Sequence, residues 1–239
     1  MSAARVRAIL RKELREYRRN RAIVITMAVV PLVFLIEPLI QVFNLPASSA
    51  GTLLHKHPLL YMLGIPAITP ALMAAASVVG ERQQGTLEPL LTTPLRREEL
   101  ILGKALAVLV PALVVSYVVF GLSVAAIEVF AQASVASAVL RGPELLAQLL
   151  FTPLVATWSI WVAMAISARS SDFRAAQQLS TLASLPTVVV CALVSFDVIH
   201  ATLGLALGFG VLLLVLDRLG WRVVSALFDR ERLITGTRS

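Results

Sequence analysis

The feature that most constrains the fold is a series of six apolar windows, each about as long as a lipid bilayer is thick. A helix rises about 1.5 Å per residue, so about twenty residues cross the roughly 30 Å hydrocarbon core. The chain is 58% hydrophobic and only 15% charged, which is too apolar for a water-soluble domain of 239 residues. We therefore predict one all-α integral membrane domain over residues 1–239, with spans at 22–41, 58–80, 101–128, 145–168, 179–196 and 201–216. Only Asp197 to His200 separate the last two windows.

The distribution of positive charge predicts the orientation. Of the 21 lysines and arginines, all but Lys56 and Arg141 fall on one side of a six-span topology. Cations in short loops are retained on the cytoplasmic side. We therefore expect a multi-pass protein of the cell (inner) membrane with both termini cytoplasmic and residues 217–239 as a cytoplasmic tail. Because the cations flank apolar windows and form no face on a soluble fold, we expect no nucleic-acid partner.

An amphipathic helix is predicted over residues 2–20, before the first span. Its apolar side chains recur at helical spacing between arginines and glutamates, and they are Val6, Ile9, Leu10, Leu14 and Tyr17. One interpretation is an interfacial helix whose apolar stripe enters the headgroup region while its arginines meet anionic lipid. The alternative is a helix packed on the protein's own cytoplasmic surface. The pattern leaves both open.

The loop between the second and third spans is predicted to contain a short cytoplasmic helix. Gly85 can break the incoming helix, Thr86 can cap the next one, and Pro94 disfavours helix at the residue before it. Glu88 suits the positive N-terminal end of such a helix, and Pro89 fits its first turn. The apolar face of this helix consists of Leu87, Leu90 and Leu91. Either a protein partner buries these leucines, or they pack on the membrane interface or on the protein's own helices.

The same loop carries a family resemblance. The run ER-x-x-GTLE-x-LL-x-x-P, followed by E-L-I-L-G-K, resembles the pattern of ABC type-2 transporter permeases. The matching positions are Glu81, Arg82, Gly85, Thr86, Leu87, Glu88, Leu90, Leu91, Pro94, Glu99, Leu100, Gly103 and Lys104.

This resemblance implies that residues 81–94, Pro89 included, form a coupling helix that docks into a groove of a separate ATPase subunit. It also implies a second permease copy or homologue, and export of a substrate out of the cytoplasm or the inner leaflet. ATP and Mg would then be bound by the partner subunit, and this chain would be a permease and not itself an enzyme.

The sequence supports no catalytic or metal site within the chain. The single Gly-Lys pair, Gly103-Lys104, lacks the preceding glycine of a P-loop. The three histidines, His55, His57 and His200, are scattered without carboxylate or thiol neighbours, so no metal site is predicted. We expect no cofactor of the chain's own.

A few residues inside the windows are candidates for a transport route or for packing. Glu37, next to Pro38 in the first span, is the candidate pathway residue, because a carboxylate in lipid is costly. Glu128 and Asp217 lie near window ends and are interpreted as interfacial anchors. The pair Gly204-x-x-x-Gly208 in the sixth window permits close helix approach.

Two other functions remain open at this stage. An ion-coupled secondary transporter needs no ATPase, although central charges are scarce and no inverted repeat is evident. A non-transporting membrane anchor could recruit a soluble protein through the same loop. Dependence of transport on ATP, and transport in liposomes with the ATPase present, separate these alternatives.

Overall fold

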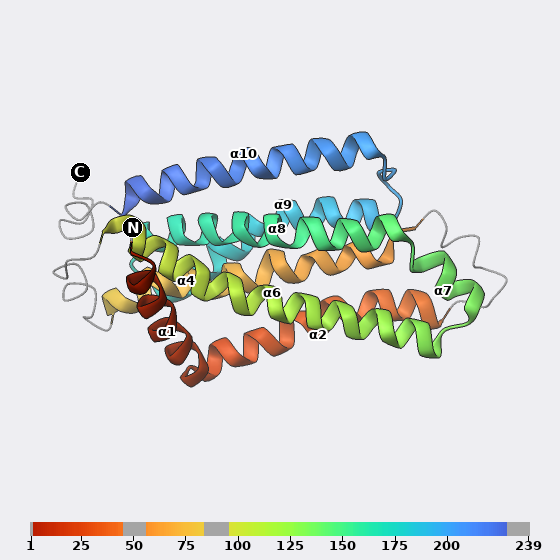
Figure 1. The fold of residues 1–239 in the computed structure, drawn as a ribbon, viewed down its shortest axis with the longest axis horizontal. Helices are drawn as coiled ribbons and strands as arrows, with labels where there is room; N and C mark the ends of the chain where they lie inside the picture. The colour runs from red at the N-terminus through yellow and green to blue at the C-terminus, as the bar shows by residue number, and fades with distance from the viewer. Residues whose placement is uncertain (1, 45–55, 84–95, 229–239) are drawn as a thin grey trace.

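The computed structural model describes residues 2–44, 56–83 and 96–228, and within these ranges it contains helices and no strand. The predicted all-α class is confirmed. In chain order the helices are α1 (Ala3–Arg19), α2 (Arg21–Phe43), the 3-10 helix η2 (Pro58–Leu63), α4 (Gly64–Gln83), α6 (Arg97–Phe130), α7 (Ala133–Val139), α8 (Gly142–Arg169), α9 (Phe173–Ser195) and α10 (Leu203–Leu227). The long helices run along a common axis, and α1 and the short α7 lie at opposite ends of the bundle (Figure 1).

Six helical segments of the described part are long and apolar enough to cross a membrane, as predicted. Asp197, whose φ of 60° lies in the left-handed region, stands in the short connection between α9 and α10. The last helix continues past the predicted end at Leu216 to Leu227. Arg218 and Arg222 are exposed on the surface of this helix. They lower the mean hydropathy after Leu216 but do not interrupt the helix.

Helix α4 lies inside the bundle and packs against α2, α6, α8 and α9. Small side chains make this possible, since Ala67, Ala71, Ala74 and Ala75 are fully buried and let neighbouring helices approach closely. Helix α10 lies at the periphery (Figure 1). An added Cβ at Gly208 would meet no atom within 4 Å, and one at Gly204 would reach Thr202 Oγ1 at 4.0 Å, so this glycine pair makes no close helix contact among the described residues.

Helix α1 crosses one end of the bundle at a steep angle to the spans (Figure 1). Its observed bounds agree with the expected helix at residues 2–20 to within a residue at each end. Its buried positions are Ile9, Glu13 and Tyr17, and both Ile9 and Tyr17 belong to a core cluster with residues of α4, α6 and α8. At these positions α1 packs on the protein itself, while Leu10 and Leu14 are half-buried.

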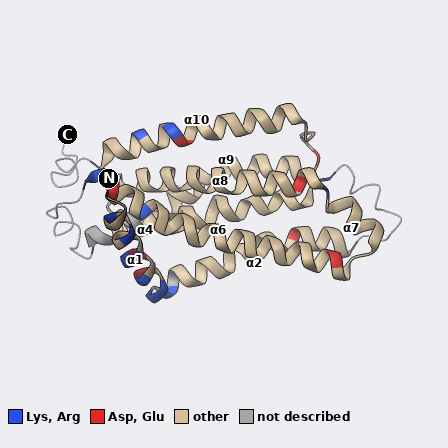
Figure 2. Ribbon diagram, in the orientation of Figure 1, with Lys and Arg blue, Asp and Glu red and all other residues tan. Residues whose placement is uncertain are grey.

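Positive charge gathers at the end of the bundle that holds α1, the start of α6 and the end of α10 (Figure 2). The opposite end holds a small polar cluster. There the guanidinium of Arg141 donates to the buried carboxylate of Glu144 and, over 2.9 Å, to the carbonyl of Lys56. His57 Nδ1 lies 3.2 Å from Glu144 Oε1, and the His57 amide donates to the Ser195 carbonyl over 3.0 Å. This cluster joins the approach to η2, the start of α8 and the end of α9.

Candidate functional site

The predicted coupling loop starts in α4 and ends before α6. Glu81 and Arg82 lie in the last turn of α4, which ends at Gln83. The remaining predicted residues lie outside the described residues, and they are Gly85, Thr86, Leu87, Glu88, Pro89, Leu90, Leu91 and Pro94. The structure therefore describes the helices that flank the loop, at the same end of the bundle as α1 (Figure 1).

The start of α6 is held by one buried carboxylate. Glu99 Oε2 accepts the backbone N–H of Arg96, the N-cap residue, over 3.2 Å, which satisfies an amide that would otherwise lack a helical partner. Glu99 Oε1 accepts the backbone N–H of Ser2 over 2.7 Å, just before α1. The guanidinium of Arg5 lies 3.4 Å from Glu99 Oε2. A single side chain thus joins the first turn of α6 to the first turn of α1.

One turn further along, α6 has no side chain where α1 crosses it. A Cβ added at Gly103 would lie 2.6 Å from Ile9 Cγ2 and 2.7 Å from Ile9 Cβ. Ile9 Cβ is attached directly to the backbone of α1, so a change of rotamer cannot move it away. Glycine at this position is therefore what allows Ile9 to pack directly on α6.

A buried ion pair completes the contact between α1 and α6. Lys104 Nζ donates to Glu13 Oε1 over 3.1 Å, and the side chains of Lys104 and Glu13 are 1% and 4% exposed. Lys12 Nζ lies 3.5 Å from the same oxygen, but its side chain is 43% exposed. Two charges taken out of water are tolerated when they are paired and hydrogen-bonded, whereas loss of one partner strands the other. We call the contacts of Glu99, Gly103 and Lys104 with α1 the α1–α6 clamp.

Hydrogen bonds to α10 and α8 also hold the two helices that flank the loop. Arg97 Nη1 donates to the carbonyl of Ser225 over 2.6 Å, which joins the start of α6 to the end of α10. On the incoming side, Ser167 Oγ donates to the Ala75 carbonyl over 2.7 Å and accepts the Val79 amide over 3.2 Å. The loop is therefore flanked by two helices that are each bonded to a neighbour near its ends.

We expect Ser167→Ala to loosen the last turns of α4. The substitution removes two hydrogen bonds between α8 and α4, each worth about 1 kcal/mol net. Thermal unfolding of the purified protein should show a loss of about 1–2 kcal/mol. The matched control is Ser184→Ala, because the buried Ser184 hydroxyl donates one turn back on its own helix, α9, to the Ser180 carbonyl over 2.9 Å. An equal loss in both variants would contradict the role given to Ser167.

Glu37, the candidate pathway residue, lies far from the loop. Gln41 Nε2, one turn further on, donates to Glu37 Oε1. The other carboxylate oxygen is buried and has no hydrogen-bond partner among the described residues. Glu37 stands sixteen residues into α2 from Arg21, which is about 24 Å along the helix. The structure does not bring Glu37 together with the coupling residues.

The described residues hold no group of three histidine, cysteine or acidic side chains that could bind a metal ion. What sequence reasoning missed is Glu13. Its position, four residues after Ile9 and four before Tyr17, places a carboxylate in the middle of the apolar face of α1. A carboxylate on the apolar face of a helix indicates that a cation of another segment is buried against it.

Comparison with known proteins adds one finding. The family model described as ABC-2 family transporter protein matches residues 7–217. The matched region runs from α1 to α10 and includes the loop between α4 and α6. No curated protein matches the chain.

Proposed function

The chain belongs to the ABC-2 transporter family as a membrane-spanning permease component, and we propose that it exports a substrate with energy from a separate ATPase subunit that docks on the loop between α4 and α6. The observation that carries this proposal is the α1–α6 clamp beside that loop. The clamp holds the start of α6 against α1. A movement of the loop would therefore be passed to α6 as a movement of the whole helix end.

The proposed mechanism couples the nucleotide state of the ATPase to the position of α6. ATP and Mg are bound by the ATPase, and the residues proposed to contact it are Glu81, Arg82 and the loop residues from Gly85 to Pro94. If the loop binds more tightly to one nucleotide state, that difference in affinity shifts the permease between two conformations. Helix α6 has 34 residues and is about 50 Å long, so it can carry this shift across the bilayer.

The orientation proposed for the protein follows from its charges. Both termini and the α1–α6 clamp lie on the cytoplasmic side of the cell (inner) membrane. The support is the gathering of positive residues at that end of the bundle (Figure 2), since such cations are retained in the cytoplasm.

We further propose that two permease copies, or this chain and a homologue, enclose the substrate route between them. Helices α2 and α10 expose large apolar side chains along most of their length, and these faces are available to a second permease as well as to lipid. Glu37 on α2 is the candidate for a residue that lines the route.

The docking proposal is tested by substitutions in the loop. We expect Glu88→Arg and Leu90→Asp each to reduce the P-loop ATPase that co-purifies with the permease from membranes by about tenfold, because a tenfold loss corresponds to about 1.4 kcal/mol, which is less than a residue at the centre of an interface can contribute. ATP-driven transport in proteoliposomes should fall in parallel, with normal membrane insertion. Glu98→Arg is the matched control, since Glu98 is exposed on the first turn of α6 and lies outside the family pattern.

Unchanged co-purification and transport in both loop variants would contradict the docking role of the loop. Transport that survives ATP depletion but collapses with an ion gradient would indicate a secondary transporter. An ATPase that binds normally without movement of any solute would indicate a membrane anchor.

A further inference from the structure

An apolar groove lies in the elbow between α1 and α2. Asn20 separates the two helices, and its side-chain oxygen accepts the Ile23 amide over 3.4 Å, which holds the first turn of α2. The groove has a volume of about 330 Å³ and lies over α4 and α6. Its lining residues are Leu14, Tyr17, Arg18, Val24, Met27, Ala28, Met73 and Pro111.

We propose that this groove binds one anionic phospholipid, with an acyl chain against its apolar walls and the phosphate at Arg18. This inference goes beyond the function proposed above and needs neither ATP nor a substrate.

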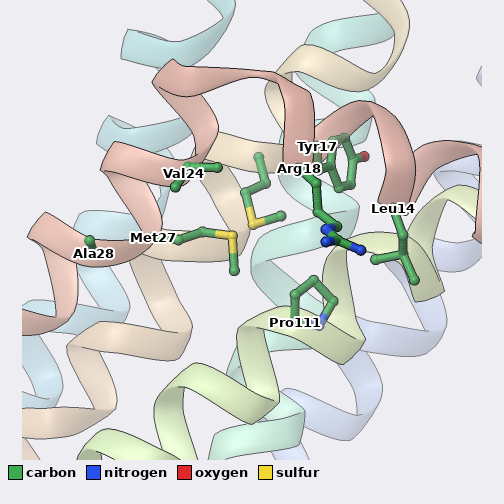
Figure 3. Close-up of a pocket in the computed structure, with 8 residues that line it drawn as sticks. Leu14, Tyr17, Arg18, Val24, Met27, Ala28 and Pro111 are labelled. Atoms are coloured by element: carbon green, nitrogen blue, oxygen red, sulfur yellow. The ribbon is translucent and has the colours of Figure 1, made fainter.

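The shape and lining of the groove fit an acyl chain. Its volume is at the lower end of the range of about 300–1,000 Å³ for small-molecule pockets, enough for part of a lipid tail and too small for a whole lipid. Figure 3 shows the side chain of Met27 entering from α2 and that of Arg18 extending from α1 toward Leu14 and Pro111. Arg18 is the one charged side chain in a lining that is otherwise apolar apart from the Tyr17 hydroxyl.

The position of the groove fits the same ligand. Val24 and Ala28, which form its α2 wall, are exposed on a helix that is a candidate membrane span. Met27 lies about 10 Å along α2 from the elbow. The groove therefore leads from the basic end of the bundle toward the depth at which acyl chains lie.

Charge complementarity selects an anionic headgroup. Arg11, Arg15 and Arg18 follow one another at intervals of four and three residues, so they share a face of α1. No carboxylate of the described ranges lies within ion-pair distance of these three residues. The nearby Glu13 is buried against Lys104 instead. A lipid phosphodiester is the anion that reaches this face while its tail occupies the groove.

The test measures lipid binding to the purified full-length chain by electron paramagnetic resonance. Spin-labelled phosphatidylglycerol and phosphatidylcholine carry the same acyl label, and the immobilised fraction gives their relative affinity. We expect the wild type to prefer phosphatidylglycerol. Arg18→Gln should reduce that preference about fivefold, since one basic residue at an anionic surface contributes about that factor. Met27→Trp should fill the groove and remove the immobilised component of both lipids.

Two matched controls distinguish binding in the groove from the general effects of surface charge and of added bulk. Arg19→Gln removes the neighbouring charge, and Val29→Trp adds the same bulk to an exposed position of α2; neither residue lines the groove, so both should behave as the wild type. Ala28→Leu fills the groove with less bulk and should weaken lipid immobilisation if Met27→Trp does not fold. Equal effects of Arg18→Gln and Arg19→Gln, or unchanged immobilisation in both groove-filling variants, would overturn the proposal.

Discussion

Replacing Lys104 by methionine is expected to destabilise the protein by about 3–5 kcal/mol, because it leaves the carboxylate of Glu13 buried without its main partner. Methionine nearly matches lysine in volume, so the loss reflects charge and not packing. The double variant Glu13→Leu/Lys104→Met should recover most of this loss, since a well-packed apolar pair replaces a buried ion pair at little cost. The measurement is the free energy of unfolding of the purified protein in detergent.

The two lysines near Glu13 provide the control. Lys12 lies 3.5 Å from the same carboxylate oxygen, but its side chain is 43% exposed and solvent screens the interaction. We expect Lys12→Met to change stability by less than about 1 kcal/mol. Similar losses for Lys12→Met and Lys104→Met would show that the pair is not buried as the structure has it.

Gly103→Ala is expected to displace α1 from α6 and to destabilise the protein by about 1–3 kcal/mol. The added Cβ would lie 2.6 Å from Ile9 Cγ2, and the backbone of α1 must move to relieve this overlap. Because the proposed coupling loop lies just before the turn of α6 on which α1 packs, ATP-driven transport should fall as well. Unfolding experiments measure the first effect, and proteoliposome transport measures the second.

The same substitution elsewhere in α6 should have the opposite sign. An added Cβ at Gly121 would meet no atom of the described residues within 4 Å. Since alanine favours a helix over glycine by about 0.5–1 kcal/mol, Gly121→Ala should stabilise the protein slightly. Stabilisation by Gly103→Ala of the same size would mean that Ile9 does not pack on the glycine.

The sequence was sufficient for those features that depend on local pattern. An apolar window of about twenty residues is a property of consecutive side chains, which is why the six spans could be predicted without a structure. The end of α10 could not, because Arg218 and Arg222 lower the local hydropathy without ending the helix. The sequence also could not decide whether α1 lies in the membrane interface or packs on the protein, because that depends on which residues contact Ile9.

For the candidate site, the sequence predicted the segment but not its contacts. The run from Glu99 to Lys104 was recognised only as the second half of a family pattern, and the structure gives its residues a physical role. Glu99 caps α6 and binds the start of α1, Gly103 admits Ile9, and Lys104 neutralises Glu13. Spacing within the chain cannot reveal such contacts, because Glu13 and Lys104 are 91 positions apart.

That separation has a consequence for how the protein is made. The ribosome synthesises α1 and the first two spans before it reaches Lys104, so in the nascent chain Glu13 has no counter-ion on α6. The docking of α1 on α6 through Glu13 and Lys104 therefore cannot precede the synthesis of the third span.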